Sequence, residues 1–81
     1  MTQIKFFYNQ ENEDLFAIFP NDIFKGIFGD KLFSCYSRVG QHSACGTEYV
    51  QESRLAKEDE YIPLLNEMIY NYGYKDLEIL M

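Results

Sequence analysis

The sequence predicts a small α+β domain, a two-layer sandwich in which one amphipathic C-terminal helix, followed by a last strand, covers a mostly antiparallel sheet of four or five strands. Two patterns indicate this class: short apolar segments alternating at period two come early, and one stripe at helical spacing comes late. Of the 81 residues, 47% are hydrophobic and 17% are aromatic. This composition is typical of a folded globule, and the length is that of one domain spanning residues 1–81.

The N-terminal segment predicts a β-hairpin. Residues 3–8 alternate at period two, and the polar residues 9–13 form the loop before a return strand at 14–19. Pro20 stops this second strand, because proline has no N–H to donate to a ladder. Both faces of the second strand are apolar, so it is either central and covered on both sides, or one face meets a partner.

The segment after Pro20 combines glycines with large apolar residues. We interpret residues 21–31 as an irregular connection whose aromatic side chains pack against the sheet edge. The alternative is an exposed patch that binds a partner. The candidate partner-facing apolar residues in this part of the chain are Phe16, Ile18, Phe24 and Phe28.

A third strand is predicted at residues 32–39, and it places Cys35 on the more apolar face as a buried, inert thiol. Residues 40–46 form a loop bounded by glycines. The next segment, 47–55, is ambiguous between helix and strand, and we favour a strand because it contains Thr47, Tyr49 and Val50.

The C-terminal part predicts a helix and a last strand. Apolar residues recur there at spacings of three and four: Tyr61, Leu64, Leu65, Met68, Ile69 and Tyr72. Proline is tolerated in the first turn of a helix, so Pro63 places the start of the helix near Asp59 or Glu60. Gly73 suits a left-handed residue after the helix, and residues 74–80 form the last strand.

The 40–46 loop is the candidate site, because it holds the only histidine, His42, together with Cys45. With Cys35 the chain offers three soft ligands where a structural zinc site needs four, so we expect no metal. A reactive Cys45–His42 pair would lack an orienting third residue and an oxyanion hole, so we expect no catalytic residue. Anion or partner binding and a purely structural turn stay open as alternatives. The candidate binding residues are Arg38, Gly40, Gln41, His42, Ser43 and Cys45.

The charge pattern narrows the partners. The net charge is −6, of which residues 47–81 carry −5 and residues 1–46 carry −1. Nucleic-acid binding requires clustered Lys and Arg, which this chain lacks, whereas an acidic face suits a basic protein surface or simply solvent. No apolar run approaches the ~18 residues of a membrane span. Two cysteines make no disulfide framework, so we expect a cytoplasmic protein without cofactors.

Four segments resemble a group of small proteins encoded by phages and mobile elements of gut Bacteroides-like bacteria: residues 17–20, 36–45, 55–61 and 72–74. The most specific part is Gly40-Gln41-His42 after a Tyr-containing strand. Those relatives typically begin a helix with Pro-Ala-Thr-Pro-Glu-Glu-Tyr, where this chain has Leu55-Ala56-Lys57-Glu58 in the first four places. The resemblance implies a phage or mobile-element setting and no particular mechanism.

From these observations we expect a non-enzymatic accessory protein that binds a protein partner, with a counter-defence or host-modulating role, and that forms a homodimer. The alternative is a small-ligand protein that binds a nucleotide or another anion through the Arg38–Gly46 loop. An enzyme that uses Cys45 and His42 is the third class.

Overall fold

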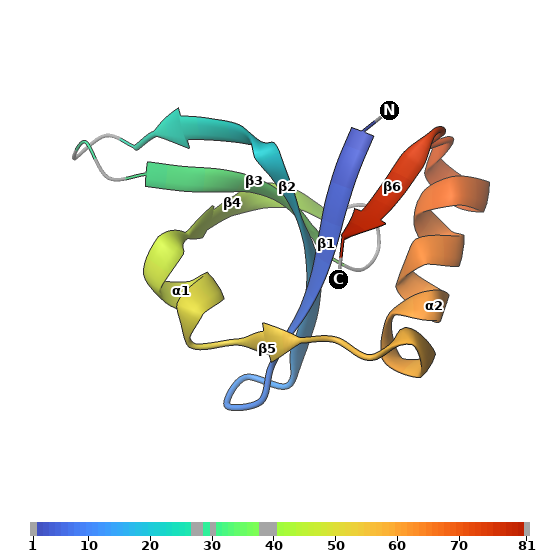
Figure 1. Cartoon of the computed structure of the whole chain (residues 1–81), viewed down its shortest axis with the longest axis horizontal. Helices are drawn as coiled ribbons and strands as arrows, with labels where there is room; N and C mark the ends of the chain where they lie inside the picture. Colours follow the sequence, from blue (N-terminus) through green and yellow to red (C-terminus); the bar gives the residue numbers. More distant parts are fainter. Residues whose placement is uncertain (1, 27–28, 30, 38–40, 81) are drawn as a thin grey trace.

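The computed structural model describes residues 2–26, 29, 31–37 and 41–80, apart from the side chains of residues 24 and 41–43. It contains a six-stranded sheet and a C-terminal helix followed by a last strand, which confirms the predicted α+β class (Figure 1). The elements in chain order are β1 (Thr2–Asn9), β2 (Asp14–Lys25), β3 (Lys31–Ser37), β4 (Gln41–Gly46), α1 (Thr47–Gln51), β5 (Arg54–Leu55), α2 (Glu58–Asn66), the π-helical turn η1 (Glu67–Asn71) and β6 (Leu77–Leu80).

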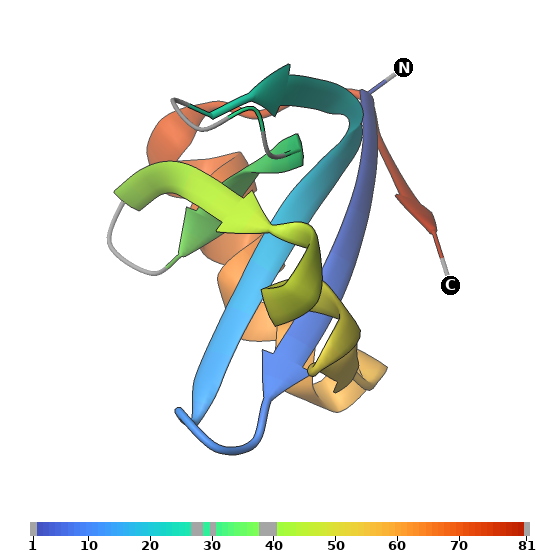
Figure 2. The same cartoon turned by 90° about the vertical axis from the view of Figure 1, so that its left-hand side faces the viewer.

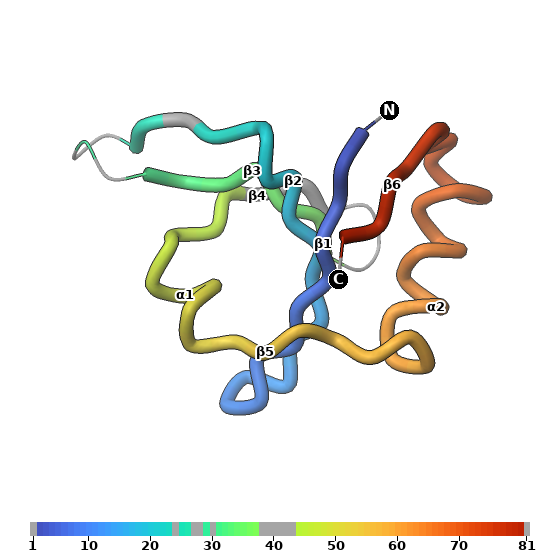
Figure 3. The backbone as a smooth tube through the Cα atoms, in the orientation of Figure 1, coloured from blue at the N-terminus to red at the C-terminus, as the bar shows by residue number. Residues whose placement is uncertain are grey.

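The sheet is antiparallel except at one edge. Its strand order is β4-β3-β2-β1-β5, and β6 also pairs with β1. The predicted hairpin of β1 and β2 is confirmed. On the other side of β1, β6 pairs in parallel with Thr2–Lys5, whereas the short β5 pairs with Phe7 and Tyr8 (Figure 3). Two short strands therefore share one edge of β1, and each covers a different part of it.

Strand β2 continues past Pro20, so the predictions that it ends there and that residues 21–25 are irregular are wrong. Phe19 and Ile23, four positions apart, pair with adjacent residues of β3. The three extra residues form a bulge, and a bulge accommodates a proline because the ladder is interrupted there. Beyond the bulge, Ile23–Lys25 of β2 pair again with Lys31–Phe33 of β3 (Figure 1). We call this end of the two strands the β2–β3 arm, and β4 pairs with Leu32 and Phe33 on its other side.

The helix α2 and the turn η1 cover one face of the sheet. The buried residues of this core are Ile4, Phe6, Ala17, Tyr36, Tyr61, Leu64 and Met68. Phe6 and Tyr61 stack with their ring centroids 4.5 Å apart, which joins β1 to the helix. Tyr36 Oη donates a 2.9 Å hydrogen bond to the Glu67 carboxylate. Helix α2 thus lies where the apolar stripe predicts it.

The ends of the helical segment differ slightly from the prediction. Helix α2 begins at Glu58, and the Glu60 carboxylate accepts a 2.8 Å hydrogen bond from the Lys57 backbone N–H at this end. Pro63 therefore lies in the second turn, where it removes one main-chain hydrogen bond. Gly73 has φ +73°, which confirms the left-handed residue predicted after the helix.

The short helix α1 covers the opposite face, so β2 is central and covered on both sides (Figure 1). The predicted strand over residues 47–55 is wrong for 47–51, which are helical. Burial of Tyr49 and Val50 against this face outweighs their preference for strands. Tyr49 Oη donates a 2.8 Å hydrogen bond to the Asp14 carboxylate, and Ser53 Oγ donates a 2.8 Å hydrogen bond to the Tyr49 carbonyl. The first bond holds α1 on β2, and the second closes the C-terminal end of α1.

Candidate functional site

The predicted 40–46 loop is a strand over most of its length. Residues 41–46 form β4, which pairs with β3 from Ser37↔Gln41 to Leu32↔Gly46. The predicted loop is therefore wrong for these residues, because a regular antiparallel ladder incorporates them. Arg38 and Gly40 lie outside the described residues, and the side chains of Gln41, His42 and Ser43 are not described. Anion binding by this segment stays a prediction.

Cys45 lies against Cys35 at the buried face under α1. Cys35 is fully buried, as the sequence predicts, and Cys45 is partly buried beside it. A hydrogen bond with Cys35, followed by burial and the Asp14 charge, raises the pKa of Cys45. His42 and Cys45 are three positions apart in one regular strand, so their backbone positions belong to opposite faces of the sheet. Because its pKa is raised, the Cys45 thiol stays protonated, and a protonated thiol is a poor nucleophile.

The predicted partner-facing residues of β2 are covered by the chain itself. Phe16 is 1% exposed and Ile18 is 3% exposed, and both pack with Tyr49 and Val50 of α1. Their assignment to a partner-binding face is wrong, because α1 occupies that face. The backbone of Phe24 lies in β2, but its side chain is not described, and Phe28 lies outside the described residues.

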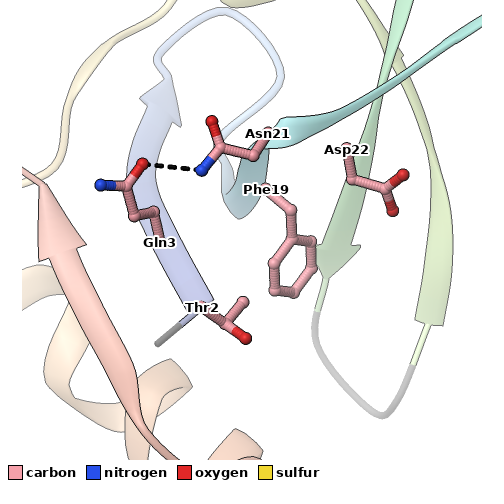
Figure 4. Close-up of a pocket in the computed structure, with 5 residues that line it drawn as sticks. All are labelled: Thr2, Gln3, Phe19, Asn21 and Asp22. Atoms are coloured by element: carbon pink, nitrogen blue, oxygen red, sulfur yellow. Dashed lines mark hydrogen bonds between the residues drawn. The ribbon is translucent and has the colours of Figure 1, made fainter.

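A polar hollow of about 400 Å³ lies between the first residues of β1 and the bulge of β2 (Figure 4). It is lined by Thr2, Gln3, Phe19, Asn21 and Asp22. Asn21 Nδ2 donates a 2.8 Å hydrogen bond to Gln3 Oε1, and Gln3 Nε2 donates a 2.9 Å hydrogen bond to Glu78. Figure 4 shows the two amides directed at each other and the Asp22 carboxylate pointing away from them. These two hydrogen bonds link β2, β1 and β6 beside the hollow, which is the structural role that the observed contacts give these residues.

An apolar hollow of about 460 Å³ opens between η1 and β6. We call it the C-terminal groove, and its lining residues are Leu65, Ile69, Tyr74, Lys75, Asp76, Leu77 and Ile79. Tyr74 stacks on Phe19 with ring centroids 5.9 Å apart, and burial raises the pKa of the Tyr74 hydroxyl. A second hollow, of about 250 Å³, adjoins the groove at Ile79 and continues past Phe6 and Leu55.

The helical turn beside the groove exposes large apolar side chains. Ile69 is 38% exposed, Tyr70 is 80% exposed and Tyr72 is 47% exposed. A regular stripe would bury Ile69 and Tyr72, but the wider π-helical turn η1 changes the angle at which successive residues leave the axis. Such turns are frequent at functional sites. The C-terminal groove and this turn are therefore the candidate functional site.

The sequence contains only part of the signal for this site. The alternation of Leu77 and Ile79 and the stripe through Ile69 both appear in it, and each predicts a buried face. What the alternation cannot show is that β6 joins β1 in parallel as an outer strand, which leaves the groove between β6 and η1 open.

Comparisons with protein-family models, with curated protein sequences and with solved structures found no match. In the part of the chain that the structure describes, no three His, Cys, Asp or Glu side chains are grouped so that they could hold a metal ion. None of the helices among the described residues has the length and apolar character that crossing a bilayer requires.

Proposed function

We propose that this chain is a non-enzymatic protein-binding module whose working surface is the C-terminal groove. The observation that carries the proposal is the combination of an open apolar hollow, lined by the exposed Ile69, with the exposed Tyr70 and Tyr72 next to Ile69 in the chain. Large exposed apolar patches on small monomers mark interaction sites, and tyrosine is enriched at such surfaces. A tyrosine ring also offers large contact area at low entropic cost.

The lining of the groove favours contact over catalysis. Among the described residues, the charged members of its lining are Lys75 and Asp76, and the lining contains no cysteine, histidine or serine. Cys45 belongs to the buried face under α1, on the other side of the sheet from α2. A surface of this kind recognises shape, apolar side chains and charge.

The resemblance of the sequence to small phage and mobile-element proteins supports an accessory role, in which the chain binds a host protein as a counter-defence or host-modulating factor. A homodimer also remains a prediction. Analytical ultracentrifugation across a concentration series measures it directly. The acidic balance of residues 47–81 argues for a different, basic partner ahead of a second copy, because like charges repel across an interface.

The proposal is tested by selecting an mRNA-displayed random peptide library against three folded proteins: the natural chain, Ile69→Lys and Ile23→Lys. Ile69 lines the groove, whereas Ile23 is 51% exposed on the β2–β3 arm, so both changes add one exposed charge. We expect shared peptide sequences to be enriched on the natural chain and on Ile23→Lys, but not on Ile69→Lys. No enrichment, or equal enrichment on all three proteins, refutes the proposal. Far-UV circular dichroism confirms that the variants fold.

A further inference from the structure

The outer edge of β6 has no neighbouring strand in the described part of the chain. β6 pairs with β1 alone, and Figure 2 shows it at the margin of the molecule beside β1. Proteins usually protect such an edge by keeping the strand short or by placing charged side chains, proline or a bulge there. Strand β6 is short and carries one charge, the acidic Glu78, but residues Leu77–Leu80 contain no proline and no lysine. β6 is therefore an edge strand whose only charged side chain is acidic.

The hydrogen-bond pattern identifies which residues present their backbone at this edge. The Thr2 N–H donates a 2.9 Å hydrogen bond to the Asp76 carbonyl, and the strands run parallel from Thr2↔Leu77 onwards. In a parallel ladder alternate residues bond to a given neighbour, so residues 76, 78 and 80 face β1. The N–H and C=O groups of Leu77 and Ile79 are consequently directed to the outer edge.

The same two residues line the groove. Leu77 and Ile79 place their side chains in the C-terminal groove, and Ile79 also lines the adjoining hollow. A strand added along β6 would bond to their backbone groups and would extend every second side chain into these hollows. Its remaining side chains would lie on the other face, beside Glu78.

Charge indicates the chemistry of the added strand. Residues 56–80 contain six acidic side chains and two basic ones. Resting on the proposed function, we propose that the partner of this protein is a basic, extended segment that adds a strand to the outer edge of β6, with its apolar residues in the C-terminal groove and its Lys or Arg residues next to Glu78. A second copy of β6 would instead bring Glu78 towards its counterpart.

The first test uses two synthetic peptides as probes, one alternating lysine with valine and one alternating glutamate with valine. We expect the lysine peptide to bind the natural chain more tightly by fluorescence anisotropy at low salt. Glu78→Lys should lower the affinity for the lysine peptide about two- to fivefold and raise the affinity for the glutamate peptide by a similar factor. This is the effect expected of one exposed charge pair. Asp22→Lys is the matched control, since Asp22 is an exposed acid outside the groove. Equal affinities of the two peptides overturn the charge assignment.

The second test changes only the backbone. Cys45 allows native chemical ligation, so the full chain can be assembled from residues 1–44 and a synthetic 45–81 segment that carries N-methyl-Ile79. This methyl group removes the outward N–H and keeps the side chain. We expect the lysine peptide to bind this protein at least about fivefold more weakly than the unmodified ligated protein, through one lost hydrogen bond and added bulk. In the unmodified protein, the peptide should slow hydrogen exchange of the Leu77 and Ile79 amides.

The outcomes separate this inference from the proposed function. If library peptides require Ile69 but N-methylation of Ile79 leaves the affinity of the lysine peptide unchanged, strand addition is refuted and protein binding stands. If neither the library nor the lysine peptide binds, both proposals fail. If ultracentrifugation shows a dimer that Ile79 N-methylation dissociates, a second copy occupies the edge and the basic partner is refuted.

Discussion

Replacing Met68 by alanine tests the orientation of η1, on which the exposure of the groove depends. Met68 is fully buried in the core under the helix, whereas its neighbour Ile69 is 38% exposed. Removing the Met68 side chain beyond Cβ loses about 2 kcal/mol of transfer free energy. The cavity left behind adds to this loss, so we expect Met68→Ala to lower the free energy of unfolding by about 3 to 4 kcal/mol.

Ile69→Ala is the matched comparison. Both substitutions remove the same number of non-hydrogen atoms, but the surroundings of Ile69 are open to solvent and no closed cavity forms there, so we expect a loss of about 1.5 kcal/mol or less. Urea unfolding followed by circular dichroism measures both, with the m-value checked for constancy. Equal losses for the two variants, or a larger loss for Ile69→Ala, would show that the assigned helix face is wrong.

Three further changes test local features of the structure. Hydrogen bonds from Arg54 hold the pKa of Glu60 at about 2, below its usual 4.5. The stability from this contact is therefore full above pH 4.5 and is lost as the pH falls through 2. Glu60→Gln should remove this pH dependence from the free energy of unfolding measured in urea. The hydrogen bond with Cys35 raises the pKa of Cys45, so iodoacetamide should alkylate Cys45 at pH 8 more slowly in the folded chain than in urea, as measured by mass spectrometry. Gly73→Ala should cost about 1 kcal/mol in urea unfolding, because φ +73° is unfavourable for a residue with a Cβ atom.

Each of these predictions has a result that contradicts it. The pH difference between the natural chain and Glu60→Gln should vanish near pH 2, and a constant difference down to that pH would rule out the Arg54 contact. Alkylation of Cys45 at the same rate in folded and unfolded protein would show a free thiol. Gly46→Ala is the control for Gly73→Ala: an added Cβ meets no atom within 4 Å at either site, but Gly46 lacks a positive φ, so it should change stability little.

The sequence predicts the elements whose pattern is local. The hairpin of β1 and β2, the buried Cys35, the helix around Leu64 and the left-handed Gly73 all follow from periodicity and backbone preference, and all are confirmed. Pro20 misleads because its missing N–H is equally compatible with a strand end and with a bulge. Only pairing with β3, which is a property of the whole sheet, distinguishes the two.

The candidate site was less predictable, because it depends on which elements cover which face. Tyr49 and Val50 read as strand residues, and their burial in α1 is a tertiary effect that removes Phe16 and Ile18 from the surface. His42 and Cys45 are reactive residue types that lie close in the sequence, yet a regular ladder separates their positions. The groove is formed mainly by apolar residues, Ile69 and Leu77 among them, which the sequence does not distinguish from core residues. They form a candidate site because β6 is an outer strand.

Internal cover on both faces of this sheet restricts where a strand-like partner could bind. The outer strands are β4 at one edge, and β6 and the short β5 at the other. Residues 41–46 contain no acidic or basic side chain other than His42, so the β4 edge has little charge with which to select a partner. β6 carries Glu78 and follows Asp76, and its apolar residues already line the groove. A basic strand therefore gains more at β6, and hydrogen-exchange protection confined to β4 after addition of the lysine peptide would refute this choice of edge.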